Sequence, residues 1–181
     1  MCLCVFVVNL LAMTDCHTSH KLVSRGAAAR WVKRLQAQGQ KVVFTNGCFD
    51  LLHLGHVRYL EEARSLGEAL VVGVNTDASV KRLGKDPSRP VNPERDRTAL
   101  LAALACVDRV VLFGEDTPLE LITALQPDIL VKGGDYRLEE IVGRDVVWAR
   151  GGEVKVIPLI TGYSTTALLA RIRKLREEPG S

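Results

Sequence analysis

The sequence predicts an α/β protein of a single domain, built on a doubly wound, five-stranded parallel sheet. Three observations support this fold class: short apolar runs alternate with amphipathic segments, the connections between them are short, and the second run is apolar throughout. A continuous apolar run is typical of a strand that helices cover on both faces. With right-handed crossovers, such an alternation gives an open sheet whose ligands bind beyond the carboxyl ends of the strands.

The individual elements follow from apolar spacing and capping residues. An apolar stripe with helical spacing covers residues 27–38 and stops at Gly39, and the first strand follows at once. Asn92 before Pro93 combines a polar cap with a proline, which marks a helix start, and leucines at 100, 101 and 104 are expected to face the core. The predicted strands cover residues 41–45, 69–74, 109–113, 128–131 and 153–157. The other predicted helices cover residues 57–66, a short stretch around position 81, and residues 118–125, 138–150 and 162–176.

The composition limits the class of protein. A chain of 181 residues with 47% hydrophobic and 25% charged residues suits a soluble domain with a core. A net charge of +3 is too small for the dense basic face of a nucleic-acid-binding protein, and 5% aromatic residues argue against a base-stacking surface. Five scattered cysteines do not indicate a disulfide framework. We therefore expect a cytoplasmic protein that binds neither nucleic acid nor a membrane.

The chain divides into an N-terminal extension at residues 1–23, a domain at 24–176 and a tail at 177–181. The apolar segment 2–13 is too short to span a bilayer, and no Lys or Arg precedes it as a secretory signal requires. One hypothesis is that Met13 is the true first residue, because the regular pattern begins only near Ser24.

The turn after the first predicted strand carries the clearest chemical signal. His53 and His56 stand three residues apart at a helix start, so both imidazoles lie on one face beside unpaired backbone N–H groups. Donors over the positive end of a helix form a site for a phosphate group. Glycine- or hydroxyl-rich segments also follow other strand ends, so four loops are expected to meet at one edge of the sheet: residues 45–56, 75–81, 132–136 and 162–166.

Motifs of other nucleotide-binding and hydrolase classes are absent. The sequence has no GxxxxGK[ST] loop, no GxGxxG after the first strand and no GxSxG turn. Instead, His53-Leu-Gly-His56, with NGCFD before it and STT near the end of the chain, resembles the HxGH nucleotidyltransferase superfamily, which implies a Rossmann-like fold. From about residue 42 to 172 the chain is similar to the D-glycero-β-D-manno-heptose 1-phosphate adenylyltransferases of ADP-heptose synthesis. The segments that carry this similarity are TNGCFDLLHLGH at 45–56, GVNTDASVKRL at 73–83, RPVNPERDR at 89–97, VKGGDY at 131–136 and GYSTT at 162–166.

The resemblance implies a reaction. A phosphate oxygen of the sugar 1-phosphate attacks the α-phosphorus of ATP, pyrophosphate leaves and ADP-heptose forms. Mg²⁺ accompanies the ATP, and we assign no protein ligand to a metal. A sugar kinase precedes this unit in bifunctional relatives, and the present length leaves no room for one, so a stand-alone form is expected. The resemblance also implies a homodimer.

The resemblance assigns roles to individual residues. His53 and His56 would donate to the α- and β-phosphate oxygens, and Lys81 would neutralise the transferring phosphoryl group. These three are the predicted catalytic residues. The predicted nucleotide- and phosphate-binding residues are Thr45, Asn46, Gly47, Phe49, Asp50, Gly55, Arg95, Gly133, Gly134, Asp135, Gly162, Ser164, Thr165 and Thr166.

Several alternatives stay open. Lys81 and Arg95 also fit solvated helix positions, and Asp50 fits an ordinary turn aspartate. Glycerol-3-phosphate cytidylyltransferases usually carry an arginine where this chain has Leu159. The absence of this arginine disfavours a reaction of CTP with a small polyol phosphate. The phosphate contact that the arginine makes would then be made by another cation: Lys85, Arg89 or Arg137. Other acceptors for ATP are pantetheine or flavin precursors. The non-enzymatic alternative is a nucleotide-binding regulator that does not turn over.

Overall fold

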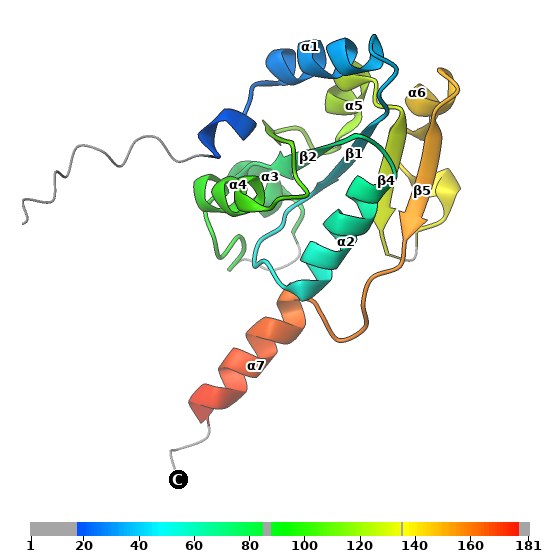
Figure 1. Cartoon of the computed structure of the whole chain (residues 1–181). Coiled ribbons are helices and arrows are strands. Elements are labelled where there is room, and N and C mark those ends of the chain that lie inside the picture. Colours follow the sequence, from blue (N-terminus) through cyan, green and yellow to red (C-terminus); the bar gives the residue numbers. More distant parts are fainter. Residues whose placement is uncertain (1–17, 85–87, 135, 178–181) are drawn as a thin grey trace, which may run out of the picture.

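The computed structural model describes residues 18–84, 88–134 and 136–177. Five parallel strands form a sheet in the order β3-β2-β1-β4-β5, which confirms the predicted fold class (Figure 1). Each strand starts within one residue and ends within two of its predicted position. The strands are β1 (Val42–Gly47), β2 (Ala69–Asn75), β3 (Arg109–Phe113), β4 (Ile129–Gly133) and β5 (Glu153–Ile157).

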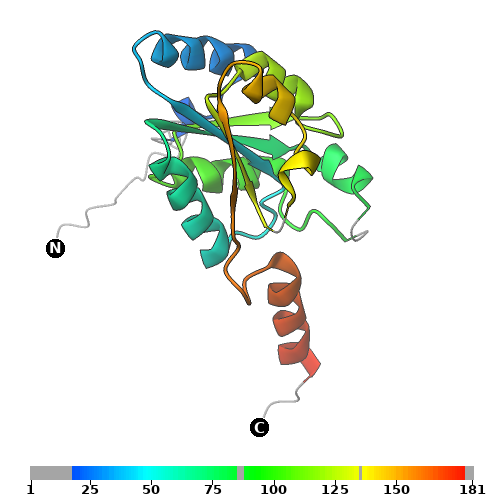
Figure 2. The ribbon, with the colours of Figure 1, turned by 90° about the vertical axis from the view of Figure 1, so that its right-hand side faces the viewer.

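Helices cover both faces of this sheet, as the doubly wound topology requires (Figure 2). On one face, α2 (Leu54–Ser65) and α4 (Glu94–Ala103) pack their apolar residues on Val43, Leu70 and Val72. On the other face, α1 (Arg25–Gln36), α5 (Leu119–Leu125) and α6 (Arg144–Trp148) pack on Val42, Phe44 and Val71. Neighbouring residues of each strand thus point into different halves of the core, which explains why these strands are apolar at consecutive positions.

Apart from shifts of up to three residues at helix ends, such as the starts of α2 at Leu54 and of α7 at Thr165, two predicted helices differ from the structure. The predicted helix over residues 138–150 is a 3-10 turn, η2 (Leu138–Glu140), followed by the short α6. Gly143 separates them with a φ of 87°, and a Cβ there would lie 2.5 Å from Ile122 Cδ1, so the chain passes α5 too closely for a continuous helix. The start of α4 also differs, because Asn92 donates its side-chain amide to the Asp50 carbonyl oxygen instead of capping the helix. Leu100, expected in the core, is 46% exposed, whereas Leu101 is buried.

The described N-terminal residues run along the edge of β3. Leu22 forms a parallel bridge with Val110, and Val23 donates its N–H to the Val110 carbonyl oxygen at 3.0 Å. Contacts with the domain therefore begin before residue 24, where we expected the domain to start. The hypothesis about Met13 concerns residues outside the described part of the chain.

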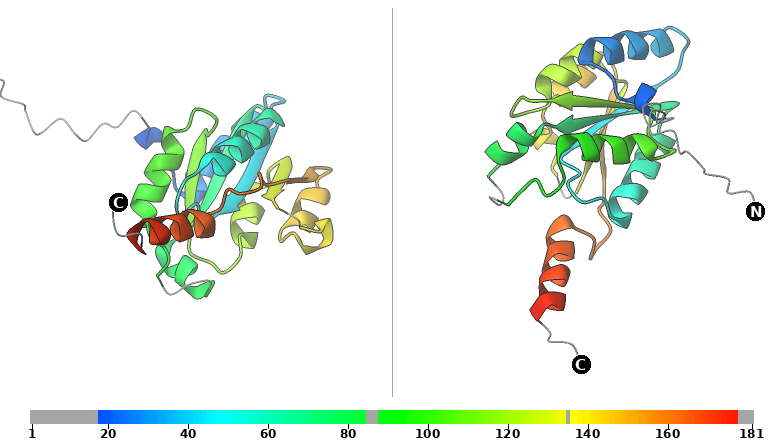
Figure 3. Two further views of the ribbon diagram at one scale, coloured as in Figure 1. Left: turned by 90° about the horizontal axis from the view of Figure 1, so that it is seen from below. Right: turned by 90° about the vertical axis from the view of Figure 1, so that its left-hand side faces the viewer.

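The last helix, α7 (Thr165–Glu177), extends away from the rest of the domain (Figure 1 and Figure 3). Its first turn lies at the carboxyl edge of the sheet, below the N-terminus of α2 (Figure 1). Towards its far end Ile172 and Leu175 are exposed. Among the described helices, none combines the length and the apolar character needed to cross a membrane.

Candidate active site

A cleft of about 280 Å³ opens at the carboxyl edge of the sheet. Its walls come from the turn after β1, the N-terminus of α2, the end of β4 and the segment before α7. Three of the four loops expected to meet therefore do so; the loop after β2 contributes to neighbouring cavities instead. Ten predicted site residues line the cleft: Asn46, Gly47, Phe49, His53, Gly55, His56, Gly133, Ser164, Thr165 and Thr166.

The two histidines form a stacked pair at the start of α2. Their ring centroids are 3.8 Å apart and the ring planes differ by 15°, so both rings lie on one face, as their spacing predicts. His53 is the N-cap residue, and its Nδ1 accepts a hydrogen bond from the His56 N–H at 3.3 Å. Because Nδ1 is an acceptor, the proton of a neutral His53 resides on Nε2. This ring is therefore fixed in the tautomer that presents an Nε2–H donor.

Both rings are neutral near pH 7. The pKa of His56 is lowered to about 4, mainly by burial, with smaller contributions in the same direction from the neighbouring His53 and Arg89. Burial also lowers the pKa of His53. A neutral imidazole still offers one N–H donor, so the pair can bind phosphate oxygens by hydrogen bonding without carrying a net charge.

Glycines allow three chain segments to approach each other in this cleft. A Cβ at Gly55 would lie 2.9 Å from Tyr163 Cβ, so only glycine lets the segment before α7 lie against the first turn of α2. A Cβ at Gly133 would lie 2.9 Å from Leu159 Cδ2. The predicted residues Gly134 and Gly162 adopt φ values of 124° and 86°, which favour glycine.

The segment from Ser164 to Thr166 opens α7 at the cleft. Ser164 Oγ accepts a hydrogen bond from the Ala167 N–H at 3.0 Å, so its hydroxyl caps the helix. Thr165 is buried, and Thr166 is exposed at the rim. The N-termini of α2 and α7 thus border the same cleft, and their unpaired N–H groups and positive dipole ends make it suited to an anion.

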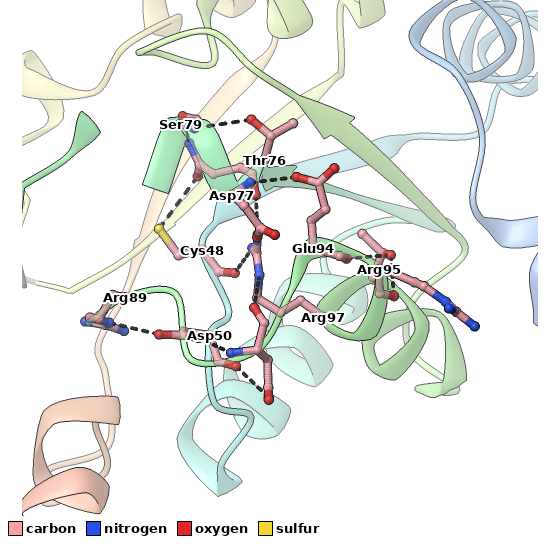
Figure 4. A network of polar contacts seen from close by, with 12 residues as sticks. Cys48, Asp50, Thr76, Asp77, Ser79, Arg89, Glu94, Arg95 and Arg97 are labelled. Atoms are coloured by element: carbon pink, nitrogen blue, oxygen red, sulfur yellow. Dashed lines mark hydrogen bonds and ion pairs between the residues drawn. The ribbon is translucent and has the colours of Figure 1, made fainter. Parts of the chain in front are cut away.

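Thr45 and Asp50 are buried next to the cleft and hold neighbouring groups in place by hydrogen bonds. The Thr45 hydroxyl is buried and hydrogen-bonds the Tyr59 hydroxyl at 2.5 Å, and Tyr59 in turn lines the cleft. Burial raises the pKa of Tyr59 well above its ordinary value, so the phenol remains protonated. Asp50 is buried and accepts hydrogen bonds from the Val91 N–H at 2.8 Å and from Arg89 Nε at 2.9 Å (Figure 4). Within the described residues, Asp50 therefore holds the loop before α4 and makes no hydrogen bond to a histidine.

Two predicted cations lie outside the cleft. Lys81 is exposed in the last turn of α3 (Asp77–Arg82), and Arg95 is exposed on α4, where its side chain points away from the network in Figure 4. Neither lines the cleft or the two cavities beside it. The predicted binding residue Asp135, and Lys85, lie outside the described residues. No cluster of three or more metal-ligating side chains occurs in the part of the chain that the structure describes.

Arg97 is a buried residue beside the site whose role the sequence pattern did not reveal. Its side chain is 0% exposed, and it donates to the carbonyl oxygens of Cys48, Asn75 and Asn92 at 2.5, 2.8 and 3.0 Å (Figure 4). It also contacts the Asp77 carboxylate at 2.8 Å. This single guanidinium ties together the turn after β1, the end of β2 and the loop before α4. Its burial could have been predicted from the sequence, because Arg97 stands four residues before Leu101 and so lies on the same, buried face of α4.

Lys132 is the second missed residue. It is the penultimate residue of β4, lines the cleft, and donates from Nζ to Asn46 Oδ1 at 2.6 Å. Burial lowers its pKa to about 8. Its place in the sequence could have indicated this role, because a lysine directly after the apolar run of a central parallel strand lies at the ligand-binding edge of the sheet.

Comparisons with known proteins agree with this geometry. Residues 44–171 match the cytidylyltransferase-like family. The chain is 56% identical over 163 residues to the bifunctional protein HldE of Magnetococcus marinus, and 61% identical over 135 residues to that of Syntrophotalea carbinolica. These matches cover 90% and 75% of the chain but only 33% and 27% of the relatives, so the chain spans a third or less of their length.

Two solved structures are also similar. The lipopolysaccharide core biosynthesis protein of Thermoplasma volcanium superposes with a TM-score of 0.57 at 34% identity, over 70% of this chain and 100% of that one. A pantoate-beta-alanine ligase of Francisella tularensis gives a TM-score of 0.53 at 12% identity, over 87% of this chain and 79% of that one. At this low identity the second similarity supports the fold alone.

Proposed function

This chain belongs to the cytidylyltransferase-like family and is a nucleotidyltransferase, and on that premise we propose that it transfers AMP from ATP to a heptose 1-phosphate, forming ADP-heptose and pyrophosphate. The observation that carries the proposal is the stacked pair His53 and His56 beside the N-terminus of α7 in one cleft. Relatives named HldE and a lipopolysaccharide core biosynthesis protein support the choice of acceptor.

The proposed reaction requires the protein to position the two substrates and to stabilise the negative charge of the transition state. The attacking phosphate oxygen is already an anion, so no general base is required. Negative charge develops on the oxygens of the α-phosphoryl group and on the leaving pyrophosphate, and preorganised donors lower the barrier. His53 and His56 would donate N–H groups to the α- and β-phosphates, while the N-terminus of α7 with Thr166 would hold the terminal phosphates.

The remaining roles are part of the same proposal. Mg²⁺ would arrive with ATP and would be held by triphosphate oxygens and water, since none of the described residues lining the cleft is a carboxylate. Lys81, in the last turn of α3, and Arg95, in the first turn of α4, are proposed to act on the triphosphate from outside the cleft. A homodimer in the cytoplasm is proposed as the working state.

Pyrophosphate release tests the proposal directly. The enzyme is assayed with each of the four nucleoside triphosphates against heptose 1-phosphate and glycerol 3-phosphate, in the presence of Mg²⁺. Rapid release is expected only with ATP and heptose 1-phosphate. A preference for CTP and glycerol 3-phosphate would favour the cytidylyltransferase alternative, and tight ATP binding without turnover of any acceptor would favour the regulator.

Two variants test the role of the histidines. His53→Ala and His56→Ala should each lower the rate by about a hundredfold or more, the usual effect of removing one preorganised donor to a transition state. Arg58→Ala is the matched control, because Arg58 lies on the same helix, is exposed and pairs only with Glu61 among the interactions described. Full activity of both histidine variants would refute their proposed role.

A further inference from the structure

A second cavity, of about 310 Å³, adjoins the cleft. Lys132 lies at the boundary and lines both spaces, together with Asn46 and Tyr136. Of these two spaces, the histidines and α7 border the cleft and not the second cavity. Beyond Lys132, the second cavity extends towards the end of β2 and the start of α5, where its polar side chains are those of Asn75, Asp116, Thr117 and Glu140.

Within residues 18–84, 88–134 and 136–177, Lys132 forms no ion pair with a carboxylate. The hydrogen bond described for Nζ is to a neutral amide, Asn46 Oδ1 at 2.6 Å, and no ion pair of Lys132 occurs among the described residues. Buried charges are normally paired, because moving an isolated ion out of water is costly. Burial lowers the pKa of Lys132, because the charged ammonium group loses contact with water. A bound anion would supply the missing charge.

Building on the proposed function, we propose that the second cavity binds the acceptor and that Lys132 Nζ contacts the acceptor's phosphate group. The polar side chains of this cavity suit a polyhydroxylated molecule, because carboxylates, amides and hydroxyls can all hydrogen-bond sugar hydroxyls. Among the described residues that line it, Lys132 alone carries a positive charge. The phosphate of a sugar phosphate is therefore drawn to the boundary and the sugar to the far end.

This placement orients the reacting groups. A phosphate at Lys132 lies next to the cleft in which the histidines hold the nucleotide. One of its oxygens forms the new bond to the α-phosphorus, while the bond from the α-phosphorus to the bridging oxygen breaks and pyrophosphate leaves with the electron pair. Lys132 also reduces the repulsion between the two anions as they approach.

Replacing Lys132 should weaken binding of the acceptor but not binding of the nucleotide. Lys132→Met should raise the KM for the acceptor at least tenfold, since a hydrogen bond to a charged group contributes about 1.5–3 kcal/mol and 1.4 kcal/mol corresponds to a factor of ten. The Kd for ATP with Mg²⁺, measured by calorimetry, should change less than about twofold, because the histidines and α7 remain. Lys155→Met is the matched control: Lys155 also lies on a strand but pairs with Glu153 and lines neither cavity.

Direct binding keeps this inference separate from the proposed function. Heptose 1-phosphate and glycerol 3-phosphate are titrated by calorimetry into the wild type, Lys132→Met and Lys132→Gln, and the melting temperature of each variant confirms folding. If the wild type makes no ADP-heptose but binds another phosphorylated acceptor in a Lys132-dependent way, the proposed function fails and the inference stands. Weaker ATP binding with an unchanged acceptor affinity would overturn it, as would wild-type affinity for the acceptor in both variants.

Discussion

Replacing Arg97 by methionine should destabilise the whole domain, because one buried guanidinium serves three backbone segments. The substitution keeps most of the apolar volume but removes every donor. The carbonyl oxygens of Cys48, Asn75 and Asn92 then lose the hydrogen bonds that they accept from Arg97.

The magnitude follows from these three hydrogen bonds. The one to Asn75 is buried, and those to Cys48 and Asn92 are part-buried. Hydrogen bonds from a charged group contribute about 1.5–3 kcal/mol each, so losing three costs roughly 3–5 kcal/mol once water solvates the part-buried acceptors. The ion pair with Asp77 adds little, since the Asp77 side chain is 33% exposed and water can solvate it. A loss of this size is a large part of the stability of a typical domain, about 5–15 kcal/mol.

Urea unfolding followed by circular dichroism gives the free energy of unfolding for comparison. Arg95→Met is the matched control, because Arg95 lies two residues earlier on the same helix but is exposed. Its stability should stay within about 0.5 kcal/mol of the wild type, as is usual for surface substitutions. A loss below about 1 kcal/mol in Arg97→Met would refute the reasoning, since the buried hydrogen bond to the Asn75 carbonyl oxygen should by itself contribute more than that.

Three further predictions concern the cleft. Gly55→Ala places a Cβ 2.9 Å from Tyr163 Cβ, and we expect overpacking of roughly 1.4 kcal/mol. Steady-state kinetics should therefore show a KM for ATP about tenfold higher than that of the wild type. Gly26→Ala is the control, because its Cβ would have no neighbour closer than 3.6 Å, and it should leave the KM unchanged. The pKa of His56 is about 4 in the folded state and near 6.5 in the unfolded state, so the unfolded state takes up the proton first as the pH falls. The free energy of unfolding should therefore decrease by about 3 kcal/mol between pH 6.5 and 4. Urea midpoints of His56→Gln should lack this contribution to the decrease. Asp50→Asn should free the loop before α4, raising its rate of proteolytic cleavage about tenfold through the loss of charged hydrogen bonds; an unchanged rate would contradict this anchoring role.

The sequence predicted those features that depend on local spacing. The strands follow from continuous apolar runs, and the shared face of His53 and His56 follows from a separation of three residues at a helix start. The convergence of the loops follows from parallel topology, since the carboxyl ends of parallel strands share one edge. None of these features needs knowledge of which side chains meet across the fold.

Features that depend on distant contacts were missed. Arg97 received no role of its own because its partners Cys48 and Asn75 are 49 and 22 residues away. Lys132 gained no functional role because its partner Asn46 is 86 residues away. The break near Gly143 depends on how closely that segment passes Ile122. Such contacts are set by packing, which a linear pattern does not encode.

The outward course of α7 has a mechanical consequence. At 1.5 Å per residue, its 13 residues form a rod about 20 Å long, fixed at its base where Ser164 caps the helix and Tyr163 lies against Gly55. A tilt of about 10° about that base displaces the far end by roughly 3–4 Å but moves the first turn by less than about 1 Å, from the same helix rise. Motion of the exposed tip is therefore only weakly transmitted to the end of the helix that borders the cleft.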